Sequence, residues 1–129
     1  MTLVLDANVA LAACGVEGGF RRLGDETLAA PPLLWSEFLS SLHVARWREL
    51  VSEAQAAASR SRLADAPITR HGHPGLGEEA WRVADDLGWA KTYDAEYIAL
   101  ARLLDSPLLT LDARMRRGAN RLGVECPPA

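Results

Sequence analysis

Four acidic side chains stand where a folded chain rarely keeps a charge without a reason. Asp6 ends the apolar run LVL, Asp112 ends the run LLTL, and Glu37 and Asp94 lie near the beginnings of two helical segments. Burying a charge is costly unless the charge is paired or bound to a metal. Strand ends and the helix beginnings that follow them share one edge of a parallel sheet, where ligands bind. We therefore expect the four carboxylates to converge.

A cluster of carboxylates calls for a cation. Two like charges about 4 Å apart repel by about 4 kcal/mol at an effective dielectric constant near 20, so such a cluster either raises its own pKa values or binds a cation. Oxygen ligands alone favour Mg²⁺ or Mn²⁺, which complete their coordination with water and phosphate oxygens. The pattern predicts phosphodiester hydrolysis, with Asp6 and Asp94 on the principal ion and Glu37 and Asp112 orienting water or a second cation.

Each acid also has a plainer explanation. Asp94 taken alone is more often the N-cap of the helix that it opens. Asp112 can be the N-cap of the basic helix after it, and Glu37 can simply complement a helix dipole. These structural roles are compatible with a shared site, because caps gathered at one sheet edge would still make a charged pocket.

Four further side chains are candidates for supporting roles. Asn8 and Thr110 are predicted to orient Asp6 and Asp112 through hydrogen bonds, although a helix-start residue and a β-branched strand residue are equally good descriptions of them. His71 and His73 invite a metal or general-base assignment. Since no third ligand stands at a recognisable spacing, we interpret them as loop residues or contributors to the rim.

Positive charge follows the last of the four acids. Arg114, Arg116 and Arg117 lie on one helical segment directly after Asp112, and Lys91 lies three residues before Asp94. We predict that these side chains contact RNA phosphates; the alternative is a solvated helix face. The formal net charge of −3 argues against indiscriminate nucleic-acid binding but leaves room for such a local patch.

Strands and helices alternate along the chain, which predicts an α/β fold with a parallel sheet covered by helices on both faces. Strands are expected at residues 3–6, in ETLAAPP, in LLTL as a central strand, and in VEC only as an edge strand. Helices are expected from about Asn8, twice within residues 33–63, in EEAWRVADDLGW, in TYDAEYIALARLLDS and in ARMRRGANRLG. The segment TYDAEYIALARLLDS is apolar almost all round, which is typical of a buried helix.

Size and composition fit one globular domain. The chain has 129 residues, of which 49% are hydrophobic and 24% charged, as in ordinary soluble proteins. Cys14 and Cys126 show neither a disulfide framework nor zinc spacing. No stretch has the length of a membrane span and the start does not look like a signal peptide, so we expect a cytoplasmic protein.

The motifs LVLDANV, LLWSEFLSSL and KTYDAEYIALARLLDSPLLTLDARM resemble those of the PIN-domain ribonucleases, specifically the VapC toxins of toxin–antitoxin pairs. The resemblance covers essentially the whole chain and places the acidic quartet of the family on the same four residues as above. It implies a single PIN domain over residues 1–129, a three-layer α/β/α fold with a short central parallel sheet. It also implies a Mg²⁺- or Mn²⁺-dependent endoribonuclease, commonly a homodimer, inhibited by a VapB antitoxin whose C-terminal segment occupies the active-site groove. Residues 60–79 depart from the pattern, so the resemblance does not assign the dimer surface or the groove walls.

Two other functions remain as alternatives. A PIN-like module without catalytic activity would keep the fold and bind only RNA or a protein partner. A phosphatase with an aspartyl nucleophile usually has a second Asp two residues after the first, and this chain has Asn8 at that position, which disfavours it.

Overall fold

The computed structural model describes all residues, 1–129. Its elements follow in the order β1 (Thr2–Leu5), α1 (Ala7–Cys14), a 3₁₀ turn η1 (Arg21–Leu23), β2 (Thr27–Ala30), α2 (Leu33–Trp47), α3 (Glu53–Ala64), β3 (Ile68–Arg70), α4 (Leu76–Leu87), α5 (Tyr93–Leu103), β4 (Leu108–Leu109) and α6 (Ala113–Arg121). Strands therefore alternate with helices, as the sequence predicts.

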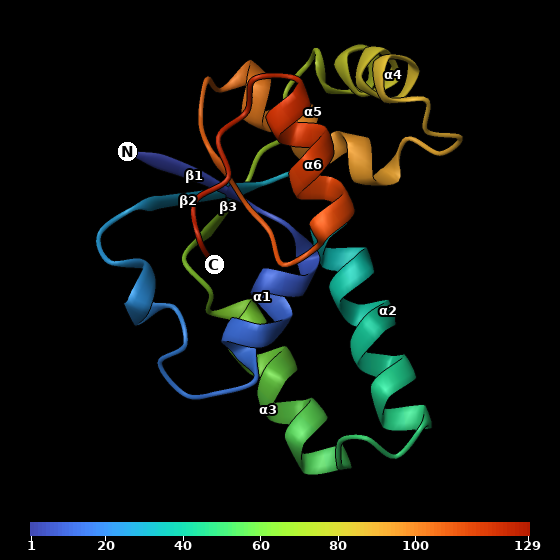
Figure 1. The fold of residues 1–129 in the computed structure, drawn as a ribbon. Helices are drawn as coiled ribbons and strands as arrows, with labels where there is room; N and C mark the ends of the chain where they lie inside the picture. The colour runs from blue at the N-terminus through green and yellow to red at the C-terminus, as the bar shows by residue number, and fades with distance from the viewer.

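One four-stranded parallel sheet organises the chain, with the strand order β3-β2-β1-β4. In Figure 1 helices α1, α2 and α3 lie on one side of this sheet and α4, α5 and α6 on the other. The expected α/β architecture with three layers and a short parallel sheet is confirmed. Because all strands are parallel, their carboxyl ends share one edge, and the residues that follow β1 and β4 meet there.

A single cluster of 29 buried apolar residues fills the space between the layers. Helix α5 contributes six buried residues from Ala95 to Ala101, and among them Tyr97, Ile98 and Leu100 are almost inaccessible to solvent. This confirms that the helix is buried on several sides. None of the helices combines the length and the apolar character that a membrane-spanning helix requires. Both cysteines are free thiols.

The sheet differs from the prediction at its β4 edge. Strand β4 has only two residues and pairs with β1 alone, so LLTL is not a central strand. The segment VEC forms no strand; its one backbone bond to β4 runs from the Leu108 N–H to the Glu125 carbonyl at 2.9 Å. Two consecutive prolines follow it, Pro127 and Pro128, and proline offers no N–H with which to extend a ladder.

The loop before α4 gives the two histidines a local structural role. The His73 Nδ1 accepts a hydrogen bond from the Gly75 N–H at 3.0 Å, directly before α4 begins at Leu76. The ring of His71 stacks on that of His73 with 5.9 Å between the ring centroids. These contacts fit the interpretation of both side chains as loop residues.

Candidate active site

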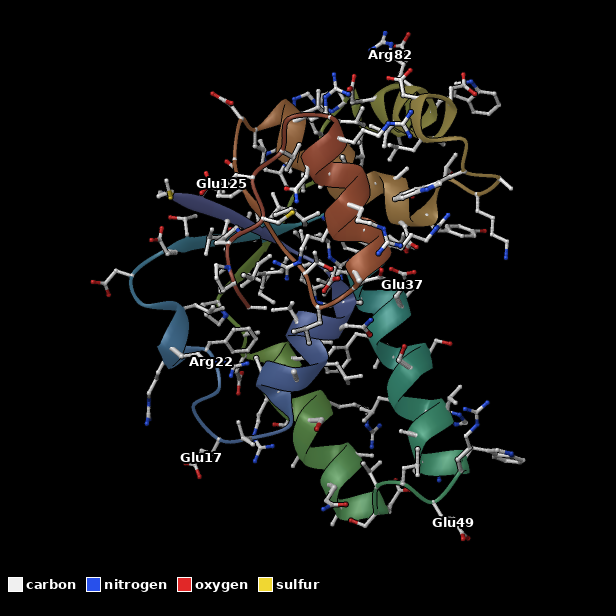
Figure 2. The ribbon with its side chains drawn as sticks, in the orientation of Figure 1. Glu17, Arg22, Glu37, Glu49, Arg82 and Glu125 are labelled. Carbon is white, nitrogen blue, oxygen red and sulfur yellow. The ribbon has the colours of Figure 1, made fainter.

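The four acids predicted from the sequence come together in one pocket at the carboxyl ends of β1 and β4. We call it the acidic pocket; it is lined by Asp6, Ala7, Asn8, Glu37, Ser41, Asp94, Tyr97, Asp112 and Met115. Its volume is about 160 Å³. Figure 2 shows Glu37 at the end of α2 that lies beside the beginnings of α1 and α6.

Asp6 is the most rigidly held of the acids. Only 3% of its surface is exposed, and its Oδ1 accepts a bond from the Val9 N–H at 2.9 Å, which caps α1. Its Oδ2 accepts a hydrogen bond from the Thr110 hydroxyl. The same hydroxyl oxygen accepts from the Asp112 N–H at 3.0 Å. A single buried side chain, Thr110, thus fixes Asp6, at the end of β1, relative to Asp112, at the beginning of α6.

Asp112 combines a structural role with its place in the pocket. Its Oδ1 accepts a bond from the Met115 N–H at 3.0 Å and so forms the N-cap of α6. The second carboxylate oxygen makes no hydrogen bond within the protein. The cap role and the predicted ligand role therefore use different oxygens and are compatible.

Glu37 has a partner that the sequence did not reveal. It is the fifth residue of α2, rather than a residue of its first turn as predicted. The Tyr97 hydroxyl donates to its Oε1 at 2.5 Å. Tyr97 is 1% exposed and follows Asp94 by three residues on α5, so both side chains share one helix face. That spacing was the only sequence signal available for it.

Asp94 does not cap its helix. Helix α5 begins at Tyr93 with Thr92 as its N-cap residue, and no side-chain cap bond forms there. The capping alternative for Asp94 is therefore wrong. Instead the Asp94 Oδ2 lies 3.5 Å from the Arg114 Nη1.

Burial raises the pKa values of three of these carboxyl groups. Desolvation is the main cause of the raised pKa of Asp6, Glu37 and Asp94, and neighbouring carboxylates raise each value further. Hydrogen bonds to Asp6 and Glu37 and the Arg114 charge beside Asp94 offset part of the rise. The pKa of the Tyr97 hydroxyl is raised by burial and by its bond to Glu37, so Tyr97 keeps its proton and donates it. The pocket therefore carries more negative charge than its surroundings neutralise.

This charge predicts a pH-dependent stability difference. The folded state raises the Glu37 pKa above the reference value of 4.5, so it binds protons more readily than the unfolded chain and loses stability as the pH rises through that window. Glu37→Gln keeps an acceptor for Tyr97 but carries no charge. In EDTA its free energy of unfolding relative to that of the wild type should increase from about pH 4 to about pH 7, measured by urea unfolding.

The matched control removes a carboxylate elsewhere. Glu17 is exposed in the loop after α1 and lies well away from Glu37 in Figure 2. The stability difference of Glu17→Gln should change less over the same pH range. A stability difference for Glu37→Gln that does not change with pH would contradict the raised pKa of Glu37.

The supporting residues are placed differently from one another. Asn8 lines the pocket with an exposed side chain and makes no hydrogen bond to Asp6. Lys91 and Arg117 are exposed and make no ion pair. The guanidinium of Arg116 is half-buried and donates to the Thr110 carbonyl at 2.8 Å and to the Cys126 carbonyl at 3.4 Å. The structure thus gives Arg116 the role of joining the end of β4 to the C-terminal segment.

The donor set fits a hard divalent cation. The acidic pocket presents carboxylate oxygens and no cysteine thiolate or imidazole nitrogen, which is the ligand chemistry of Mg²⁺ and Mn²⁺. As the side chains stand, no group of three or more His, Cys, Asp or Glu residues is arranged to coordinate an ion. Glu37 and Asp94 are engaged by Tyr97 and Arg114, so coordination by all four acids requires side-chain adjustment.

Comparison with known proteins supports the family resemblance over most of the chain. A family model described as the PIN domain matches residues 3–120. Ribonuclease VapC9 of Mycobacterium tuberculosis is 34% identical over 114 residues, which cover 88% of this chain and 87% of that protein.

Solved structures share the fold at lower identity. PAE2754 from Pyrobaculum aerophilum superposes with a TM-score of 0.73 at 24% identity, over 98% of this chain and 83% of that one. VapBC2 from Rickettsia felis, bound to a DNA fragment from their promoter, gives a TM-score of 0.71 at 13% identity, over 99% and 98% of the two chains.

Proposed function

The chain belongs to the PIN-domain family and, within it, to the VapC ribonucleases, and we propose that it hydrolyses RNA with a Mg²⁺ or Mn²⁺ ion held in its acidic pocket. The observation that supports this most strongly is the convergence of four carboxylates from four different elements at one sheet edge. Asp6 and Asp94 are the proposed ligands of the principal ion. Glu37 and Asp112 complete the site by orienting water or a second cation.

The protein's own groups prepare this site before any substrate arrives. Val9 and Thr110 fix the direction of the Asp6 carboxylate, and the Tyr97 hydroxyl fixes that of Glu37. Each of these bonds goes to a carboxylate oxygen and stabilises its ionised form. When bound, the cation would polarise the scissile phosphate and lower the pKa of a bound water.

Substrate contacts are proposed for the exposed cations near the pocket. Arg114 and Arg117 on α6 and Lys91 before α5 can meet the phosphates of RNA, because their side chains are exposed. Arg116 was part of the predicted set, but its donors are engaged by backbone carbonyls. We therefore restrict the proposed phosphate contacts to the other three.

Cleavage assays with and without a chelator test the proposed function. Purified protein should cleave single-stranded RNA in Mn²⁺ or Mg²⁺. EDTA should abolish cleavage and excess Mn²⁺ should restore it, because the carboxylates of the pocket cannot replace the cation as the Lewis acid. Cleavage that persists in EDTA would contradict the metal mechanism. Absence of cleavage for every RNA tried would favour the alternative of a silent binding module.

We also propose that a VapB-type antitoxin binds this chain. The support is the likeness to VapBC2 and the relatedness to VapC ribonucleases. The homodimer implied by the family resemblance stays a prediction.

A further inference from the structure

The indole of Trp89 packs against helix α6 at a point where only glycine provides enough space. Trp89 lies in the loop between α4 and α5, and its ring packs against Gly118. A Cβ atom at position 118 would lie 2.9 Å from the Trp89 ring and 2.9 Å from the Leu87 side chain. Such an approach is closer than van der Waals contact, so the ring can pack this close to the helix only because residue 118 is a glycine.

Arg114, one turn earlier on α6, contacts the same indole ring. It precedes Gly118 by four residues, so both lie on one face of α6. Its guanidinium carbon lies 4.2 Å from the centroid of the Trp89 ring, a cation–π contact. The ring therefore limits where this long side chain can go and holds its charged end beside α5.

From that position Arg114 reaches the acidic pocket. Its Nη1 lies 3.5 Å from the Asp94 Oδ2, and it is the only cationic side chain paired with any of the four acids. The side chains of Arg114 and Asp94 are 53% and 41% exposed. A half-exposed ion pair is weak and can be exchanged for a stronger partner.

We propose that Trp89 is a positioning residue that holds Arg114 at the mouth of the acidic pocket, where Arg114 pairs with Asp94 until a cation takes that carboxylate and then binds an RNA phosphate. The inference rests on the proposed function, since it assigns an order to the cation and the substrate at that site. Arg114 thus competes with the cation for Asp94 but cooperates with it in holding RNA.

The two roles predict effects of opposite sign for one substitution. Arg114→Gln removes the charge that competes for Asp94, so Mn²⁺ should bind the free protein roughly two- to fivefold more tightly. The same change removes a phosphate contact, so RNA should bind roughly tenfold more weakly. A residue with a purely structural role would not strengthen the binding of the cation.

Calorimetric titration of Mn²⁺ into RNA-free protein measures the first effect. The matched control is Arg121→Gln, which removes the same charge from the last turn of α6 and makes no ion pair with the four acids. Its Mn²⁺ affinity should stay within about twofold of the wild type. Unchanged or weaker Mn²⁺ binding by Arg114→Gln would overturn the competition.

Fluorescence anisotropy with a labelled single-stranded RNA in Mn²⁺ measures the second effect. All proteins in this series carry Glu37→Gln, which we expect to block cleavage. Arg114→Gln should lower the affinity and reduce the slope of log K against log salt by about 1. An unchanged affinity and slope would show that Arg114 does not contact phosphate.

Two variants test Trp89 itself. Trp89→Leu removes the aromatic face, and Gly118→Ala displaces the ring without removing it. Each should weaken RNA binding in the series above, and neither should weaken it further once Arg114→Gln is present. Full RNA affinity in a folded Trp89→Leu or Gly118→Ala protein would overturn the positioning role.

The outcomes separate this inference from the proposed function. A wild-type protein that binds no Mn²⁺ and cleaves no RNA contradicts the proposed function. A wild-type protein that binds Mn²⁺ and cleaves RNA, together with Arg114→Gln titrations that match the wild type, contradicts only the inference.

Discussion

Asp94→Asn is expected to lower RNA cleavage roughly a thousand-fold, because losing about 4 kcal/mol of electrostatic stabilisation of the transition state corresponds to three factors of ten in rate. Asparagine matches the size of aspartate but lacks the charge that a hard cation requires. The fold should be intact, since the Asp94 side chain caps no helix and is only half-buried. Cleavage rates in saturating Mn²⁺, with circular dichroism and thermal unfolding, measure both expectations.

Asp105→Asn is the matched control for this substitution. Asp105 lies beyond the opposite end of α5 and is exposed. It has a positive φ of 48°, a conformation that asparagine also tolerates. Its cleavage rate should equal that of the wild type. Normal cleavage by Asp94→Asn would remove Asp94 from the catalytic machinery.

The convergence of the acids could be predicted because it depends on connectivity. An apolar strand that ends in a carboxylate places that carboxylate at the strand's carboxyl end whatever the surrounding packing, and parallel strands align these ends. Asp6 and Asp112 needed no more than this. The structure adds that both also cap the helices that follow them, so the structural and the chemical interpretations of each residue hold together.

The partners of these acids could not be predicted, because they depend on packing between elements far apart in the sequence. Tyr97 meets Glu37 across 60 residues, and an apolar helix gives no sign that one of its buried side chains donates a hydrogen bond into a pocket. The direction of an arginine on a basic helix is equally hidden. Arg114 turns to the pocket and Arg116 to backbone carbonyls, although both belong to the same charge pattern.

The position of LLTL in the sheet was predicted wrongly for a related reason. Its four residues are apolar enough for a strand buried on both faces, and Leu108, Leu109 and Thr110 are indeed buried. The burial comes from α5, which packs against β4, and from the C-terminal segment beside it. A buried strand is therefore not always a central one, and only the strand order distinguishes the two.

Thr110→Val should weaken both the fold and the site, because a single hydroxyl serves both. Valine has nearly the same shape but leaves the Asp6 Oδ2 and the Asp112 N–H without their partner. An unsatisfied buried polar group costs about 1–3 kcal/mol, which urea unfolding in EDTA would measure. Loss of a residue that orients a metal ligand typically costs about 10- to 100-fold in metal affinity or activity, and we expect cleavage to fall within that range.

Thr110→Ser separates the hydroxyl from the methyl group, because it keeps the donor and acceptor and loses only apolar contact. The cleavage rate and Mn²⁺ affinity of Thr110→Ser should remain close to those of the wild type even if its stability falls. In Thr110→Val the cleavage rate, the Mn²⁺ affinity and the stability should all decrease. Equal losses of cleavage in both variants would assign the effect to packing of the β4 end. Wild-type cleavage by Thr110→Val would show that the Val9 N–H alone, at 2.9 Å from the Asp6 Oδ1, is sufficient to aim this carboxylate.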